Sequence, residues 1–145
     1  MLLGLFVPLA VFAQGNTNVN SDAKQIQGAW RLIYQQSQGN KLPDEKTAEM
    51  FHGQITFDGN NKMHYTVELP GFDFEFSYKL DTSRQPKWID MSLINTPKNG
   101  NNVTKLLGIY QLGENTLDIC YGITNRPIAF SADAGSDNVL IRLKR

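Results

Sequence analysis

Asp73 and Glu75 are the two carboxylates whose spacing could support acid–base chemistry. Two positions apart on a strand, they would lie about 7 Å from each other, a separation found between the general acid and base of inverting glycosidases. The alternation of their segment places both on its polar side, away from the expected core. We therefore expect a solvated outer face there, and we expect Asp90 either to tie a loop or to pair with a nearby base such as Lys87. A hydrolase or isomerase that uses Asp73, Glu75 or Asp90 is the less favoured alternative.

Other reactive side chains are few. The two histidines, His52 and His64, lie in different segments, whereas a zinc site needs three or four ligands, usually with closely spaced pairs. Motifs of the G-x-S-x-G, G-x-G-x-x-G and P-loop kinds are absent from the sequence. Cys120, the single cysteine, lies in an alternating segment and is expected to be a small buried filler. We therefore expect no metal, no cofactor and no catalytic residue, in a protein that is not an enzyme.

Aromatic side chains are the residues of this chain that could line a ligand cavity. Alternation over 63–69 and 72–80 places rings on one side of two consecutive segments. In a closed barrel, the cavity at the end opposite Trp30 would be lined by Tyr65, Phe74, Phe76, Tyr78, Met91 and Tyr110. Alternation leaves the inward direction of the last two undecided. Such a lining suits a small apolar or aromatic molecule oriented by tyrosine hydroxyls, although the same rings could instead fill the barrel as its core.

The elements that must position these side chains are mostly strands. Period-two alternation predicts strands over 30–36, 54–57, 63–69, 72–80, 88–93, 103–112, 116–121 and 138–143. Short helices are expected over 23–26, capped by Ser21 or Asp22, and over 42–50, with an extended piece at 128–130. Strands joined in series by short turns favour an all-β, eight-stranded, up-and-down antiparallel barrel, which has no free edges. A two-sheet sandwich is the alternative.

A known superfamily shows the same arrangement of special residues. A short helix, Gly-x-Trp at the head of the first strand and an arginine on the last strand resemble the calycin or lipocalin superfamily, and the matching residues are Gly28, Trp30 and Arg142. The resemblance implies a lipocalin-like barrel in which Trp30 closes one end and Arg142 lies across its ring. Gly28, without a side chain, would let the backbone pass close under the barrel floor.

A closer resemblance covers nearly all of the chain after its first residues. It is carried by the blocks QGAWRLIYQQSQGNKLP, YKLDTSRQPKWIDM, LLGIYQLGENTLDICYG, RPIAFSA and VLIRLKR. In this order they are similar to an uncharacterised lipocalin-like bacterial family known mostly from planctomycetes. The resemblance implies an architecture and an export route but no reaction.

The N-terminus predicts export. Residues 2–12 are apolar, and Val11-Phe12-Ala13 fits a cleavage site, although no basic residue precedes the apolar run. Eleven apolar residues are too few to span a bilayer, which needs about 20. We expect a signal peptide over 1–13, a polar linker over 14–22 and a barrel domain over 23–145. The mature protein would be secreted or periplasmic.

Charge limits the kinds of partner. The 145 residues include 14 basic and 14 acidic side chains, which gives a formal net charge of zero. This balance argues against nucleic acid, because phosphate binding needs a concentrated basic face. We expect a monomer whose partner is a small apolar ligand. The alternative is a protein-interaction or envelope scaffold module with a filled barrel.

Overall fold

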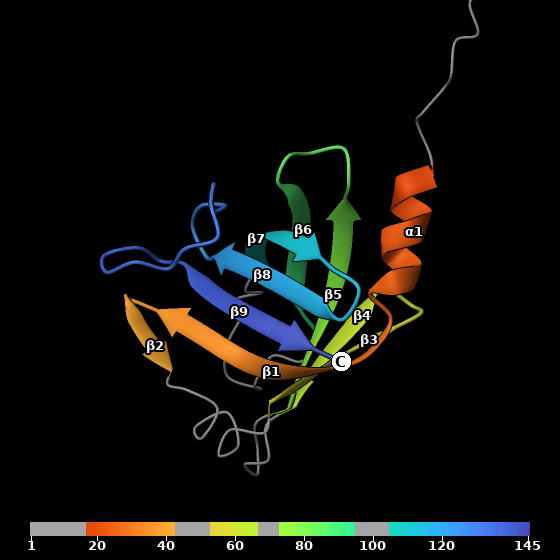
Figure 1. Cartoon of the computed structure of the whole chain (residues 1–145), viewed down its shortest axis with the longest axis horizontal. Coiled ribbons are helices and arrows are strands. Elements are labelled where there is room, and N and C mark those ends of the chain that lie inside the picture. Colours follow the sequence, from red (N-terminus) through yellow and green to blue (C-terminus); the bar gives the residue numbers. More distant parts are fainter. Residues whose placement is uncertain (1–16, 43–52, 67–72, 95–104) are drawn as a thin grey trace, which may run out of the picture.

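The strands form one antiparallel sheet that closes on itself. A computed structural model describes residues 17–42, 53–66, 73–94 and 105–145. In these residues the sheet order is β2-β1-β3-β4-β5-β6-β7-β8-β9, and pairing between β1 and β9 closes the ring (Figure 1). The elements are α1 Thr17–Gln25, β1 Gly28–Ser37, β2 Asn40–Leu42, β3 Gln54–Asp58, β4 Lys62–Thr66, β5 Asp73–Asp81, β6 Lys87–Leu93, β7 Lys105–Leu112, β8 Thr116–Gly122 and β9 Val139–Lys144. The predicted eight-stranded, all-β barrel is confirmed, with β2 as an additional strand.

Strand β1 closes the barrel because it has neighbours on both edges. One edge pairs with β9, with a register shift between Leu32 and Tyr34 that is typical of a β-bulge. The other edge pairs with β3 through the first residues of β1 and with β2 through its last three. Leu42, expected at the start of a helix, therefore belongs to β2. The rest of that predicted helix, 43–50, lies outside the described residues, as do 67–69, 72 and 103–104 of the predicted strands, His52 and the expected signal peptide.

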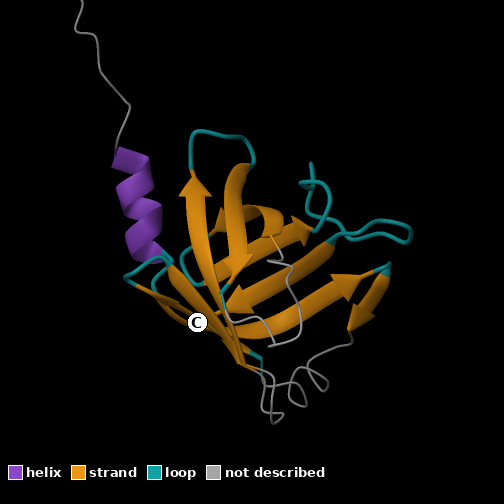
Figure 2. Cartoon of the chain, turned by 180° about the vertical axis from the view of Figure 1, so that it is seen from behind, coloured by secondary structure: helices purple, strands orange, loops and turns teal. Residues whose placement is uncertain are grey.

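Helix α1 is longer than the sequence predicted. It begins at Thr17 and includes residues 17–22, which were expected as linker, so Asp22 lies inside the helix and is not its cap. Asn and Ser are weak helix formers, but Ile26 and Asp22 are buried against the barrel, and such packing supplies most helix stability in proteins. The helix lies at one end of the barrel, near the C-terminus (Figure 2). Among the described residues, no helix has the length and apolar character to cross a membrane.

Alternation along the strands produces two hydrophobic cores. The inner core fills the barrel around Trp30, Phe57, Ile89 and Tyr110. The outer core lies on the other face of the sheet, and its buried members are Ile109, Cys120, Ala132 and Leu140. Neighbouring residues such as Ile109 and Tyr110 belong to different cores because successive side chains point to opposite faces.

Segment 123–138, between β8 and β9, covers the outer core. It contributes Ala132 and Phe130, and the extended piece expected at 128–130 is a series of bends instead of a strand. Cys120 is fully buried beneath this segment, and its thiol donates to the carbonyl of Ser131 at 3.4 Å. The prediction that Cys120 is a buried filler is confirmed.

Candidate ligand site in the barrel

A cavity of about 130 Å³ lies inside the barrel, toward the end opposite Trp30. Seven of the eight barrel strands contribute to it, through Gln35, Ile55, Met63, Tyr65, Phe76, Leu106, Tyr121 and Ile141. Most of this lining is hydrocarbon or aromatic ring. The polar atoms come from the amide of Gln35 and the hydroxyls of Tyr65 and Tyr121, and no charged side chain of the described residues lines the cavity.

The two cavity tyrosines are held in their neutral form. Burial raises the pKa of Tyr65. Burial, with a smaller contribution from the neighbouring Tyr65, raises the pKa of Tyr121 to about 12. At neutral pH both hydroxyls are therefore able to donate and accept hydrogen bonds. Within the described part of the chain neither has a hydrogen-bond partner, so both are available to a bound molecule.

The structure divides the six residues expected to line this cavity into three groups. Tyr65 and Phe76 line it. Phe74 stacks on Tyr65, with ring centroids 6.4 Å apart, but is not part of the lining. Tyr78, Met91 and Tyr110 are buried in the inner core. The Tyr110 hydroxyl bonds Asp22 of α1, and the Tyr78 hydroxyl bonds Gln27, just after the helix. The alternation of Leu117-Asp118-Ile119-Cys120-Tyr121 contained the signal for the missed Tyr121, since it shares a face with the buried Leu117.

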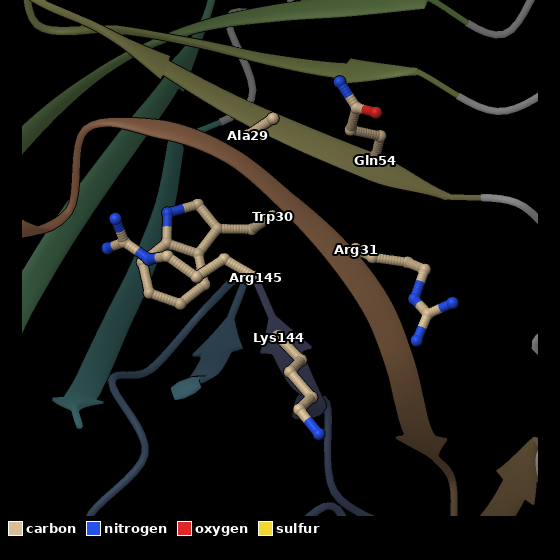
Figure 3. A pocket seen from close by; sticks show the side chains of 6 residues that line it. All are labelled: Ala29, Trp30, Arg31, Gln54, Lys144 and Arg145. Atoms are coloured by element: carbon tan, nitrogen blue, oxygen red, sulfur yellow. The ribbon is translucent and has the colours of Figure 1, made fainter. Parts of the chain in front are cut away.

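Trp30 closes the opposite end of the barrel. It is fully buried, and its Nε1 donates to the carbonyl of Ile26 at 2.7 Å. The guanidinium of Arg145, not of Arg142, lies over the indole, with Cζ 3.9 Å from the ring centroid (Figure 3). Arg145 also donates to the carbonyl of Gln25, which ties the end of α1 to the floor.

The prediction that Arg142 covers Trp30 is wrong because of strand alternation. Ile141 and Leu143 point inward, so Arg142 between them points outward, whereas Arg145 continues the inward series. On the outer face Arg142 donates two hydrogen bonds to Asp118, at 2.8 and 3.0 Å. Gly28 occupies the entrance to β1 with a φ of 100°, a conformation that other residues rarely adopt.

A partly buried ion pair fixes α1 on the closed end. Asp22 accepts hydrogen bonds from Lys87 Nζ and from the Tyr110 hydroxyl, each at 2.7 Å. Burial and the bond to Asp22 both raise the pKa of Tyr110. Tyr78 makes a second link, since its hydroxyl accepts a bond from Gln27 at 3.0 Å. The helix therefore seals this end with polar contacts as well as with Ile26.

Of the two roles predicted for Asp90, the structure confirms the tie to a loop and not the pairing with Lys87. Asp90 and Lys87 are three positions apart on β6, so they project to opposite faces. Asp90 instead accepts a hydrogen bond from Arg126 at 2.6 Å. Arg126 also donates to the carbonyl of Gly108 at 2.5 Å and lies 4.0 Å from the ring centroid of Trp88. This contact holds segment 123–138 against β6 and β7.

The remaining candidates for chemistry lie on the outer surface. Glu75 forms an ion pair with Lys62 at 3.2 Å, and His64 lies 3.6 Å from a carboxylate oxygen of Asp58. Neither Asp73 nor Glu75 lines the cavity. Over the described ranges, no three His, Cys, Asp or Glu side chains gather in a way that could hold a metal ion.

Comparison with protein-family models, with curated proteins and with solved structures gives no match for this chain. Its function is therefore inferred from the geometry of the barrel, which is plugged at one end and contains a cavity toward the other.

Proposed function

We propose that this chain is an exported, lipocalin-like binding protein whose barrel holds a small neutral molecule. The observation that carries the proposal is the cavity of about 130 Å³, which is apolar in most of its lining and has two phenols without a hydrogen-bond partner among the described residues. A void of about 150 Å³ is known to accept benzene, whereas drug-sized ligands occupy roughly 300–1,000 Å³. The volume therefore favours a molecule with one ring or an aliphatic group of similar size.

The lining also selects the polarity of the ligand. A charged group would lose its hydration and find no opposite charge among the described cavity residues, at a cost of several kcal/mol. A hydroxyl or carbonyl on the ring would pair with Tyr65 or Tyr121. A phenol-like molecule satisfies both conditions, and we propose binding without catalysis as the role of the barrel.

Calorimetric titration with 4-methylphenol and with toluene tests this proposal. We expect both to bind, the phenol more tightly. Tyr121→Phe should reduce this preference by roughly two- to tenfold, the usual worth of one hydrogen bond, and Ile141→Phe should abolish binding by filling the cavity. Tyr34→Phe, on the outer core, is the matched control and should change neither affinity. Absence of binding and of any rise in melting temperature with both ligands would contradict the proposal.

Export belongs to the same proposal and has a separate test. Mass spectrometry of the protein recovered from the medium or the periplasm should give a chain that begins at Gln14. A chain that retains residues 1–13 in the cell interior would contradict export while leaving ligand binding unaffected.

A protein-interaction module is the second candidate function. Two large apolar side chains on segment 123–138 are exposed, Ile128 at 92% and Ile123 at 64%. Double substitution of these residues with serine should abolish capture of a stoichiometric envelope partner if this function holds, and should leave binding of 4-methylphenol unchanged.

A further inference from the structure

A second hollow, which we call the basic cleft, lies outside the barrel at the closed end. Its volume is about 250 Å³, and it is lined by Ala29, Trp30, Arg31, Gln54, Lys144 and Arg145 (Figure 3). Three of these six residues are cations and none is acidic. The cleft is independent of the barrel cavity, with which it shares no lining residue.

Two of the cations occupy directly opposite positions on the paired strands β1 and β9. Arg31 of β1 is the direct partner of Lys144 of β9, and their Cβ atoms should therefore be about 5 Å apart. Like charges in directly opposite positions destabilise a sheet. Figure 3 shows both side chains extending away from the indole of Trp30.

No acidic side chain of the described residues forms an ion pair with Arg31 or Lys144. The outward-facing row that crosses β3, β1, β9 and β8 consists of Gln54, Arg31, Lys144 and Thr116. The nearest acid on these strands, Asp118, is held by both hydrogen bonds from Arg142. Among the other described lysines, Lys62 and Lys87 have carboxylate partners, whereas no ion pair with a described residue involves Lys79 or Lys105. Within the described residues, the basic cleft therefore has cationic side chains without acidic side-chain partners.

We propose that the basic cleft binds the phosphate group of a small soluble molecule. The planar guanidinium of Arg31 can bind two oxygens at once, and the ammonium of Lys144 adds a charge beside it. The amide of Gln54, which donates to Thr56 at 3.2 Å, has a second N–H at the edge of the cleft. Arg145 adds positive potential while its guanidinium stays on Trp30. A bound dianion would turn the repulsion between Arg31 and Lys144 into attraction of both for one ligand.

Titration with inorganic phosphate, followed by amide chemical shifts at constant ionic strength, tests the proposal. We expect saturable changes at Arg31, Gln54 and Lys144, and a rise in melting temperature that chloride does not produce. Arg31→Gln combined with Lys144→Gln should weaken binding by roughly tenfold or more, the effect of about 1.4 kcal/mol. The matched control is Lys79→Gln combined with Lys105→Gln, which removes two exposed lysines of β5 and β7 and should change affinity less than twofold. Equal weakening by the two double variants, or an equal effect of chloride, would overturn the proposal.

A membrane source for the phosphate has its own test. Vesicles of phosphatidylglycerol should bind the protein no better than vesicles of phosphatidylcholine. Binding to the anionic vesicles, together with no response to free phosphate, would overturn the assignment of a soluble ligand.

A charge reversal provides a second measurement. Lys144→Glu replaces a like-charged pair with an opposite one, so in phosphate-free buffer of low salt it should raise the melting temperature and remove the response to phosphate. A melting temperature that does not rise would show that the two charges do not repel each other in the free protein, and would overturn the proposal.

Discussion

Trp30 combines three interactions that a smaller residue cannot replace. Its ring is fully buried, its Nε1 binds the carbonyl of Ile26, and its face carries the guanidinium of Arg145. Trp30→Ala should lower the free energy of unfolding by about 3–5 kcal/mol, the cost of a large buried truncation. Urea denaturation measures this loss. A change of about 0.5 kcal/mol, typical of surface positions, would contradict the role of Trp30 as the barrel floor.

Substitutions of Arg142 and Arg145 can be compared directly, because the two arginines have different contacts. Arg145→Gln removes the cation that lies on Trp30 and the bond to Gln25, so it should destabilise the protein by about 1–2 kcal/mol. Arg142→Gln removes an ion pair on the outer face and should cost about 0–1 kcal/mol. The opposite order of the two losses would restore the assignment suggested by the sequence.

Gly108 permits the close packing of three strands. A methyl group there would lie 2.9 Å from Cγ2 of Ile89, 3.0 Å from the Ile89 carbonyl oxygen and 3.2 Å from that of Cys120. Gly108→Ala should therefore cost about 1–3 kcal/mol, as overpacking in a core does. Gly59→Ala is the control, since nothing lies within 4 Å of the added methyl. Equal unfolding free energies for the two variants would show that the strands can separate without cost.

At the scale of elements, the attachment of α1 depends on Asp22. Asp22→Ala leaves Lys87 and Tyr110 without their acceptor and should destabilise the protein by about 1.5–3 kcal/mol, the value for hydrogen bonds to a charged group. Lys24→Ala on the exposed side of the same helix should have little effect. Hydrogen exchange of the α1 amides should accelerate in the first variant only. Unchanged exchange would mean that Ile26 and the bond from Arg145 to Gln25 hold the helix without Asp22.

Local alternation predicts elements well where a strand has one polar and one apolar face. The strands from β3 to β6 follow this pattern, and their pairing in series follows from short turns such as Asp58-Gly59. Contacts distant in sequence were not predictable in the same way. The helical start at Thr17 depends on the burial of Asp22 and Ile26 against the barrel, and β2 depends on the edge of β1 that β3 leaves uncovered.

The candidate site was predicted only in part, for a related reason. Alternation identifies which side chains face inward but not how far along the barrel each one lies. Tyr65 and Tyr78 both point inward, yet one lines the cavity and the other reaches Gln27 near the closed end. The stagger of the strands decides this difference, and it is set by the β1–β9 pairing that closes the ring.

At the scale of the whole molecule, buried tyrosines should make the protein sensitive to alkali. Unfolded tyrosines ionise near pH 10, but the pKa of Tyr121 is raised to about 12 and that of Tyr110 is also raised. The native state keeps these protons while the unfolded state loses them. Stability should therefore be fully present below about pH 10 and should fall above it, by about 1.4 kcal/mol per pH unit for each tyrosine. Urea denaturation between pH 9 and pH 12 measures the slope, which Tyr121→Phe should reduce by one tyrosine's share. An unchanged slope in that variant would contradict the raised pKa.

The outer core contains a natural probe of local opening, the thiol of Cys120. Cys120 is the single thiol of the chain, and segment 123–138 shields it completely. A thiol reagent can therefore react only when this segment lifts or the barrel unfolds, and the dependence of the labelling rate on denaturant separates these two events. Arg126→Ala, which releases the segment from Asp90 and Gly108, should accelerate labelling more than it lowers global stability. The same label would report, without any engineered probe, whether a partner bound to Ile123 and Ile128 keeps the segment closed.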